Sequence, residues 1–102
     1  MTPTARTIAL MRERGFTADV VERRITKRLT RDFLGIIDVI ALKEGCAPWF
    51  IQTTGGNNKW MRRQKMLESP HLPLLQSVGT VVLHEWNQLK NGEWSPREEV
   101  LL

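Results

Sequence analysis

The feature that most restricts the fold of this 102-residue chain is an apolar run over residues 33–42 that contains a single acid, Asp38. The β-branched residues of this run and its short length favour a buried central strand over a helix. Turn residues follow over 43–48, and a second strand-like stretch covers 49–54. The sequence therefore predicts an antiparallel hairpin over 33–54, in the interior of a sheet.

Periodicity, capping residues and turn residues predict an α-β-β-β-α-β-β order, which is an α/β fold with a mixed β-sheet flanked by helices. Asn91-Gly92 predicts a C-terminal hairpin, and Pro96 places its second strand at an edge. No repeat or linker is present, so a single domain over 1–102 is expected. The other expected elements are a helix over 4–14 that Thr2 or Thr4 caps and Gly15 ends, a strand over 16–25, a helix over 58–68, a short helical turn before Gly79, and strands over 80–86 and 93–102.

Composition narrows the classes of protein to consider. Fifteen basic and 11 acidic residues give a net charge of +4, which permits a nucleic-acid partner. No run approaches the ~18 apolar residues of a membrane span, and the N-terminus has no secretory h-region. The single cysteine excludes an internal disulfide, so a cytoplasmic location is expected. His84, on an otherwise apolar strand, is expected to be a structural histidine.

Asp38 needs a partner, because an ionised carboxylate buried alone costs several kcal/mol. In one interpretation, Asp38 lies on a solvated face of the sheet or pairs with an arginine. In the other, it is a metal ligand, since Gln52 and Thr54 share one face of the neighbouring strand and the hairpin can bring them beside Asp38. An acid and two polar side chains in this layout are typical of a divalent-cation nuclease site.

The residues Asp38 and Gln52-Thr53-Thr54, after a predicted N-terminal helix, resemble the PD-(D/E)XK nuclease superfamily. The resemblance covers roughly residues 4–66 and is strongest to small Holliday-junction-resolvase-like and phage-type members. Asp38 falls at the family's Pro-Asp motif, with Ile37 in the Pro position, and residues 52–54 fall on its (Asp/Glu)-X-Lys motif.

This resemblance implies a restriction-endonuclease-like core and a metal-dependent DNA endonuclease that hydrolyses phosphodiester bonds. Asp38, Gln52 and Thr54 are then the expected catalytic residues, with Thr54 positioning water. The expected ligands of Mg²⁺ or Mn²⁺ are Asp38, the Gln52 side chain and the Thr53 backbone carbonyl. The expected partner is DNA, with branched DNA as one form, in the cytoplasm of a bacterial or phage-infected cell, and a homodimer is plausible by the same resemblance.

Three positions depart from the family's pattern. Gln52 stands where the family has an acid, which keeps an oxygen ligand but removes a charge. Thr54 stands where the family has a lysine, and Lys43, Lys59 and Lys65 are the candidates to supply that ammonium from another element. The family's first-helix acid is also absent, which leaves Glu13 or Glu22 as substitutes. Asp32 is either a second carboxylate of the site or a solvated acid paired with Arg28 or Arg31.

Basic residues gather in two runs, 23–31 and 59–65, on either side of the predicted hairpin. They are either solvated charges or contacts to a phosphate backbone. Two alternatives to the enzyme remain open: a catalytically impaired nuclease-fold DNA-binding or accessory module, and a protein-interaction subunit. The residues predicted to contact DNA are Arg28, Arg31, Asn57, Asn58, Lys59, Arg62 and Arg63.

Overall fold

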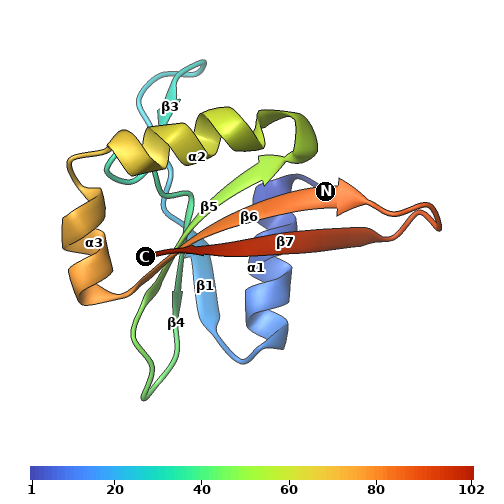
Figure 1. The fold of residues 1–102 in the computed structure, drawn as a ribbon, viewed down its shortest axis with the longest axis horizontal. Coiled ribbons are helices and arrows are strands. Elements are labelled where there is room, and N and C mark those ends of the chain that lie inside the picture. Colours follow the sequence, from blue (N-terminus) through green and yellow to red (C-terminus); the bar gives the residue numbers. More distant parts are fainter.

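A five-stranded mixed sheet with helices on both faces forms the centre of the structure, a computed structural model that describes residues 1–102 (Figure 1). None of the helices has the length and apolar character that crossing a membrane requires. The elements in chain order are α1 (Pro3–Glu13), β1 (Thr17–Val20), β2 (Arg23–Arg24), β3 (Thr30–Arg31), β4 (Val39–Leu42), β5 (Trp49–Gly55), the 3₁₀ turn η1 (Gly56–Asn58), α2 (Lys59–Glu68), α3 (Leu72–Val78), β6 (Thr80–Gln88) and β7 (Trp94–Leu101).

The strand order of the sheet is β1-β4-β5-β6-β7, and β2 and β3 form a separate two-stranded ribbon. All neighbouring strands of the sheet are antiparallel except β5 and β6, which are parallel. A parallel pair needs a crossover, and η1, α2 and α3 supply it. The β4–β5 and β6–β7 pairings confirm both predicted hairpins, and Pro96 lies on the edge strand β7 as expected.

Alternating residues of the strands form two separate hydrophobic cores, one on each face of the sheet. Phe50, Val81 and Leu83 pack with residues of α2 and α3, including Met66 and Leu75. The residues between them in sequence point to the opposite face, because successive side chains of a strand alternate. There Ile51 and Val82 pack with Met11 of α1. The sheet is thus enclosed between α1 and the α2–α3 pair.

The predicted strand over 33–42 is wrong in its first half. A turn closed by a bridge between Phe33 and Ile37 covers that part of the chain, and the strand begins only at Val39. Leu34 (φ 51°) and Gly35 (φ 78°) adopt left-handed conformations, which a strand does not contain. Ile36 and Ile37 are buried by packing with residues of α2 and α3 rather than by sheet pairing, whereas Phe33 and Leu34 are exposed. Asp38 consequently lies at the entrance of β4.

The end of α3 approaches the β4–β5 loop so closely that only glycine fits at position 79. A Cβ atom on Gly79 would collide with the backbone oxygen of Pro48, which accepts a hydrogen bond from Thr80 N at 2.8 Å. Its φ of −161° is open to any residue, so the effect is purely steric. We expect Gly79→Ala to lower the free energy of unfolding by about 1–3 kcal/mol. Urea unfolding measures it, with Gly55→Ala, which meets nothing within 4 Å, as the control; equal stability of the two variants would contradict the expectation.

Candidate functional site

Asp38 is held at the start of β4 by its backbone and its side chain together. Its N–H donates to Ile51 O at 2.9 Å, and its carbonyl accepts from Val21 N at 2.8 Å. Its Oδ2 accepts hydrogen bonds from Thr53 N (3.0 Å) and Thr53 Oγ1 (3.1 Å). Thr4 Oγ1 lies 2.9 Å from Thr53 Oγ1 and must be the donor there, since the Thr53 proton is directed to Asp38. Helix α1 therefore braces the acid through Thr53.

Gln52 lies behind Asp38, with only 1% of its surface exposed. When its amide nitrogen faces the available acceptors, it donates to Asp38 Oδ2 at 3.2 Å and to Ile36 O at 2.6 Å. Its amide oxygen then accepts from Arg62 Nη1 at 2.8 Å. This contact directs the Arg62 guanidinium from α2 toward Asp38, so Gln52 positions an arginine here. Its role as a metal ligand stays a prediction.

Three carboxylates meet at this point. Oxygen atoms of Glu22, Asp32 and Asp38 all lie within 4.8 Å of one another. Burial and the neighbouring Asp32 together raise the pKa of Asp38 from 3.8 to about 7, against the opposing effect of the hydrogen bonds from Thr53. The cluster therefore favours either a shared proton or a bound cation over three unscreened negative charges.

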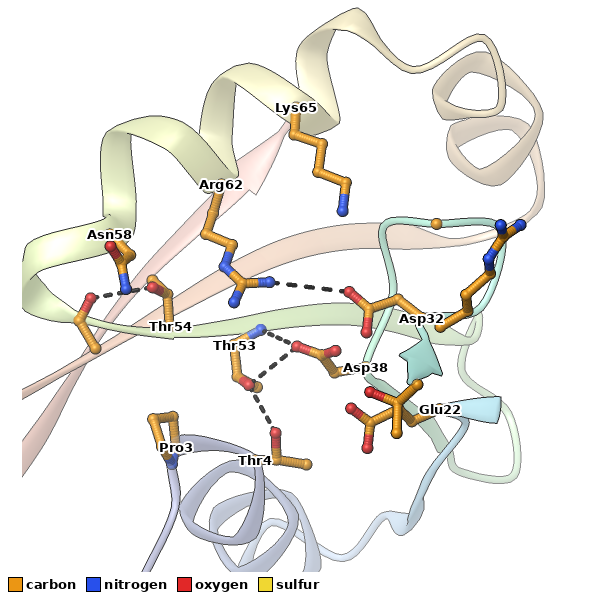
Figure 2. Close-up of a pocket in the computed structure, with 14 residues that line it drawn as sticks. Pro3, Thr4, Glu22, Asp32, Asp38, Thr53, Thr54, Asn58, Arg62 and Lys65 are labelled. Atoms are coloured by element: carbon orange, nitrogen blue, oxygen red, sulfur yellow. Dashed lines mark hydrogen bonds and ion pairs between the residues drawn. The ribbon is translucent and has the colours of Figure 1, made fainter. Parts of the chain in front are cut away.

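These acids line a polar cavity of about 670 Å³. Figure 2 shows Arg62 and Lys65 projecting into it from α2, toward Asp32 and Asp38, while Thr4 faces it from α1 on the opposite side. An Arg62 Nη1 atom lies 3.9 Å from Asp32 Oδ2, so this arginine connects Gln52 to the acid cluster. No hydrophobic residue lines the cavity, which suits it to a charged, hydrated ligand.

The structure brings several of the predicted residues to this cavity: Asp38, Thr53, Thr54, Asn58, Arg31 and Arg62 line it. Thr54 Oγ1 donates to Gly55 O at 3.0 Å. Arg28 and Asn57 lie outside the lining, and Arg63 pairs with Glu99 at 2.8 Å.

The structure shows which of the alternative lysines and acids left open by the sequence lie at the cavity. Of the three candidate lysines only Lys65 lines the cavity, because Lys43 donates to Arg14 O at 3.2 Å and Lys59 lines a different hollow beside Trp60. Of the two candidate substitutes for the first-helix acid, Glu22 belongs to the carboxylate cluster and Glu13 does not. Asp32 belongs to the cluster as well, and its basic partner is Arg62 rather than Arg28 or Arg31. Thr4 was proposed only as a helix cap, and nothing in the sequence distinguishes it from Thr2, which is the actual cap.

A second polar network crosses the sheet on the α1 side and is structural. His84 Nδ1 lies 3.0 Å from Thr7 Oγ1, and His84 Nε2 lies 2.7 Å from Glu98 Oε2. Trp86 Nε1 donates to the same threonine at 2.9 Å. A hydroxyl, an imidazole and a carboxylate in a row can activate a nucleophile, but Thr7 and His84 are both 0% exposed and no substrate reaches them. The prediction of a structural His84 is confirmed.

The molecule is thus an α/β protein with an acidic cavity walled on one side by cations, at the point where β4 and β5 meet α1 and α2. The chain matches no family model, no curated protein and no solved structure. Its function is therefore argued from the chemistry of this cavity and from the sequence resemblance.

Proposed function

We propose that the protein is a divalent-cation-dependent DNA endonuclease with a PD-(D/E)XK-like, restriction-endonuclease-like core. One observation carries the proposal: three carboxylates within 4.8 Å share a cavity with the side chains of Arg62 and Lys65. Acids that can hold a cation and bases that can hold a phosphate are the two requirements of phosphodiester hydrolysis assisted by a metal.

The acid cluster suits Mg²⁺ or Mn²⁺ in its donor atoms. Both ions take oxygen ligands, and Glu22, Asp32 and Asp38 offer carboxylate oxygens in one place. The protein's donors bind Asp38 at Oδ2, which leaves Oδ1 for a further partner. A cation held there supplies a Lewis acid that polarises a phosphate and lowers the pKa of a bound water.

The basic wall of the cavity has its own part in this proposal. Arg62 and Lys65 offset the negative charge of a phosphodiester and orient it toward the acids. Lys65 supplies from α2 the ammonium that Thr54 lacks in the family's lysine position. Gln52 acts as a positioning residue, since it holds the Arg62 guanidinium through a 2.8 Å hydrogen bond.

The order of elements supports the same proposal. When the separate β2–β3 ribbon is set aside, the chain runs through a helix, three strands of the main sheet and a helix as α1, β1, β4, β5 and α2. The resemblance implies this order for the superfamily's core. Asp38 lies at the start of the second of these strands, and Gln52–Thr54 lie on the third. The proximity of Asp38 to β4 and the place of Gln52–Thr54 on β5 support the proposal.

The decisive experiment measures cleavage of supercoiled plasmid and of a four-way DNA junction, with Mg²⁺, Mn²⁺ or EDTA present. We expect cation-dependent cleavage, and a rate about 10³-fold lower in Glu22→Gln/Asp32→Asn, because several kcal/mol of cation-assisted stabilisation are lost. The control Glu44→Gln/Glu93→Gln removes two exposed acids outside the cavity and should cleave like the unmodified protein. Calorimetric titration with Mn²⁺ should show binding that only the first variant loses.

Two outcomes would contradict the proposal that the protein is an enzyme. Salt-sensitive DNA binding with no cleavage under any cation would indicate the accessory DNA-binding module. The absence of both DNA binding and cleavage would indicate the protein-interaction subunit.

A further inference from the structure

Residues 23–31 form a basic ribbon that stands apart from the main sheet. The segment comprises β2, β3 and their turn, carries five cations and contains no acid. Figure 1 shows the ribbon projecting from the body of the molecule past α2. Every residue of the ribbon is exposed. The five cations are Arg23, Arg24, Lys27, Arg28 and Arg31.

The ribbon is shaped by its own backbone. Arg23 pairs across the strands with Arg31. At the turn, Ile25 N donates to Leu29 O at 2.9 Å, and Thr26 Oγ1 accepts from Leu29 N at 3.0 Å. The hairpin therefore does not depend on contacts of its charged side chains.

These cations have no acidic partner within the protein, and the side-chain contact among them is a 3.5 Å hydrogen bond that Arg24 Nη2 donates to Lys27 O. None of the five belongs to an ion pair, whereas Arg14, Arg62, Arg63 and Arg97 each face a carboxylate within 4.0 Å. Like charges directly opposite each other destabilise an antiparallel pair, so the Arg23–Arg31 pair opposes the ribbon's own stability. An anion from outside the molecule would remove that repulsion.

The ribbon leads directly into the acidic cavity. Glu22 and Asp32 flank it in sequence and both line the cavity, as do Thr30 and Arg31 at its base. The base of the ribbon and the three carboxylates are therefore neighbours on one surface of the molecule, and Figure 2 shows Glu22 and Asp32 close to Asp38.

We infer that the basic ribbon lies in the major groove of a B-form DNA duplex, next to the phosphodiester on which the cavity acts. The substrate class of the proposed nuclease is then duplex DNA. This inference rests on the proposed function. The major groove of B-DNA is about 12 Å wide and admits a two-stranded β-ribbon, and cations on both strands then face phosphates on both sides. The major groove of A-form RNA is too narrow and deep for side chains to read. Preference for a DNA duplex over an RNA duplex is therefore part of the inference.

Fluorescence anisotropy in EDTA with a 20-bp DNA duplex tests the ribbon without any chemistry. We expect Lys27→Gln/Arg28→Gln to make the slope of log K against log[salt] shallower by about 1.8, because each lost phosphate contact removes about 0.9. The control Lys90→Gln/Arg97→Gln removes two cations from the β6–β7 hairpin and should leave the slope unchanged. The unmodified protein should bind the DNA duplex more tightly than the RNA duplex of the same sequence, the single strand, or vesicles with an anionic surface.

Equal binding of these four ligands, or an unchanged slope in the ribbon variant, would overturn the inference. Hydrolysis of bis(4-nitrophenyl) phosphate with Mn²⁺ separates it from the proposed function, because this small diester has no groove. If the protein hydrolyses the small diester but the ribbon variant binds the DNA duplex like the unmodified protein, only the ribbon inference fails. If duplex binding depends on the ribbon but neither the diester nor DNA is hydrolysed, only the proposal of a nuclease fails.

Discussion

Asp38→Asn should raise the free energy of unfolding at pH 8 by about 2–4 kcal/mol while abolishing cation-dependent cleavage. Burial and the adjacent Asp32 raise the pKa of Asp38 to about 7, so at pH 8 the folded protein holds a carboxylate that its surroundings disfavour. Asparagine keeps an oxygen for the two hydrogen bonds from Thr53 and carries no charge. It also removes a carboxylate that the proposed cation requires.

The pH dependence identifies the cause. The unfolded chain releases the Asp38 proton near the ordinary pKa of 3.8, but the folded protein retains it up to about pH 7. Between these values the unfolded state binds fewer protons, so this carboxyl lowers stability as the pH rises. The advantage of the asparagine variant should therefore be absent below pH 4 and grow until about pH 7.

Urea unfolding at pH 4, 6 and 8 measures this difference. Asp19→Asn is the matched control, because Asp19 is an exposed acid whose Oδ1 accepts from Val20 N at 2.8 Å, a bond that asparagine also makes. Mn²⁺ should stabilise the unmodified protein at pH 8 and leave the Asp38 variant unchanged. A less stable Asp38→Asn protein at pH 8 would mean that the ionised carboxylate supports the fold.

His84→Ala should lower the free energy of unfolding by about 3–5 kcal/mol, a large part of the 5–15 kcal/mol typical of a domain. The substitution leaves a cavity where a fully buried ring was, and it removes a partner of Thr7 and of Glu98 at once. Burial lowers the pKa of His84, so the ring is neutral, with Nδ1 accepting from Thr7 and Nε2 donating to Glu98.

The other histidine of the chain supplies the control. His71 is exposed before α3, and His71→Ala should change stability by less than about 0.5 kcal/mol. Urea and thermal unfolding measure both variants. The Glu98 carboxyl gives a second readout: burial alone raises its pKa, but hydrogen bonds from Arg14 and His84 outweigh burial and lower it, so His84→Ala should move this pKa upward by NMR titration. Equal stability of the two histidine variants would show that the buried network contributes nothing.

Local signals in the sequence were sufficient for most of the elements, but the expected strand over 16–25 is wrong beyond Val20, because Arg23–Arg24 pair with β3 in a separate ribbon. Thr2 accepts from Ala5 N at 3.1 Å as a helix cap, Gly15 takes a φ of 90° just past α1, and Asn91-Gly92 turns between β6 and β7. The failure over 33–38 has a physical origin: the same apolar residues suit a strand and a buried turn equally, and packing beneath the helices decides between them. Pattern alone does not reveal a left-handed Leu34.

The candidate site was predictable where it depends on strands and unpredictable where it depends on docking. The hairpin register pairs Val39 with Ile51, so it brings Asp38 next to Gln52 and Thr53 at the start of the pairing. The way α2 packs on the sheet decides that Lys65 lines the cavity and that Lys59 lines a different hollow. No spacing in the sequence encodes the contact between Gln52 and Arg62, because it needs that same docking.

The hydrogen bonds of α1 have a consequence for the order in which the chain folds during its synthesis. Thr7 contacts His84 and Trp86, which lie 77 and 79 positions further along the chain. Contacts at such separation form late in folding, because a long loop must close before they are gained. A ribosome releases the N-terminal helix first, and the hydrogen bonds of Thr7 to His84 and Trp86 become available only once β6 has emerged. The contact of Thr4 with Thr53 needs only β5, so the side of α1 that faces the acidic cavity can form before the buried network around His84 is complete.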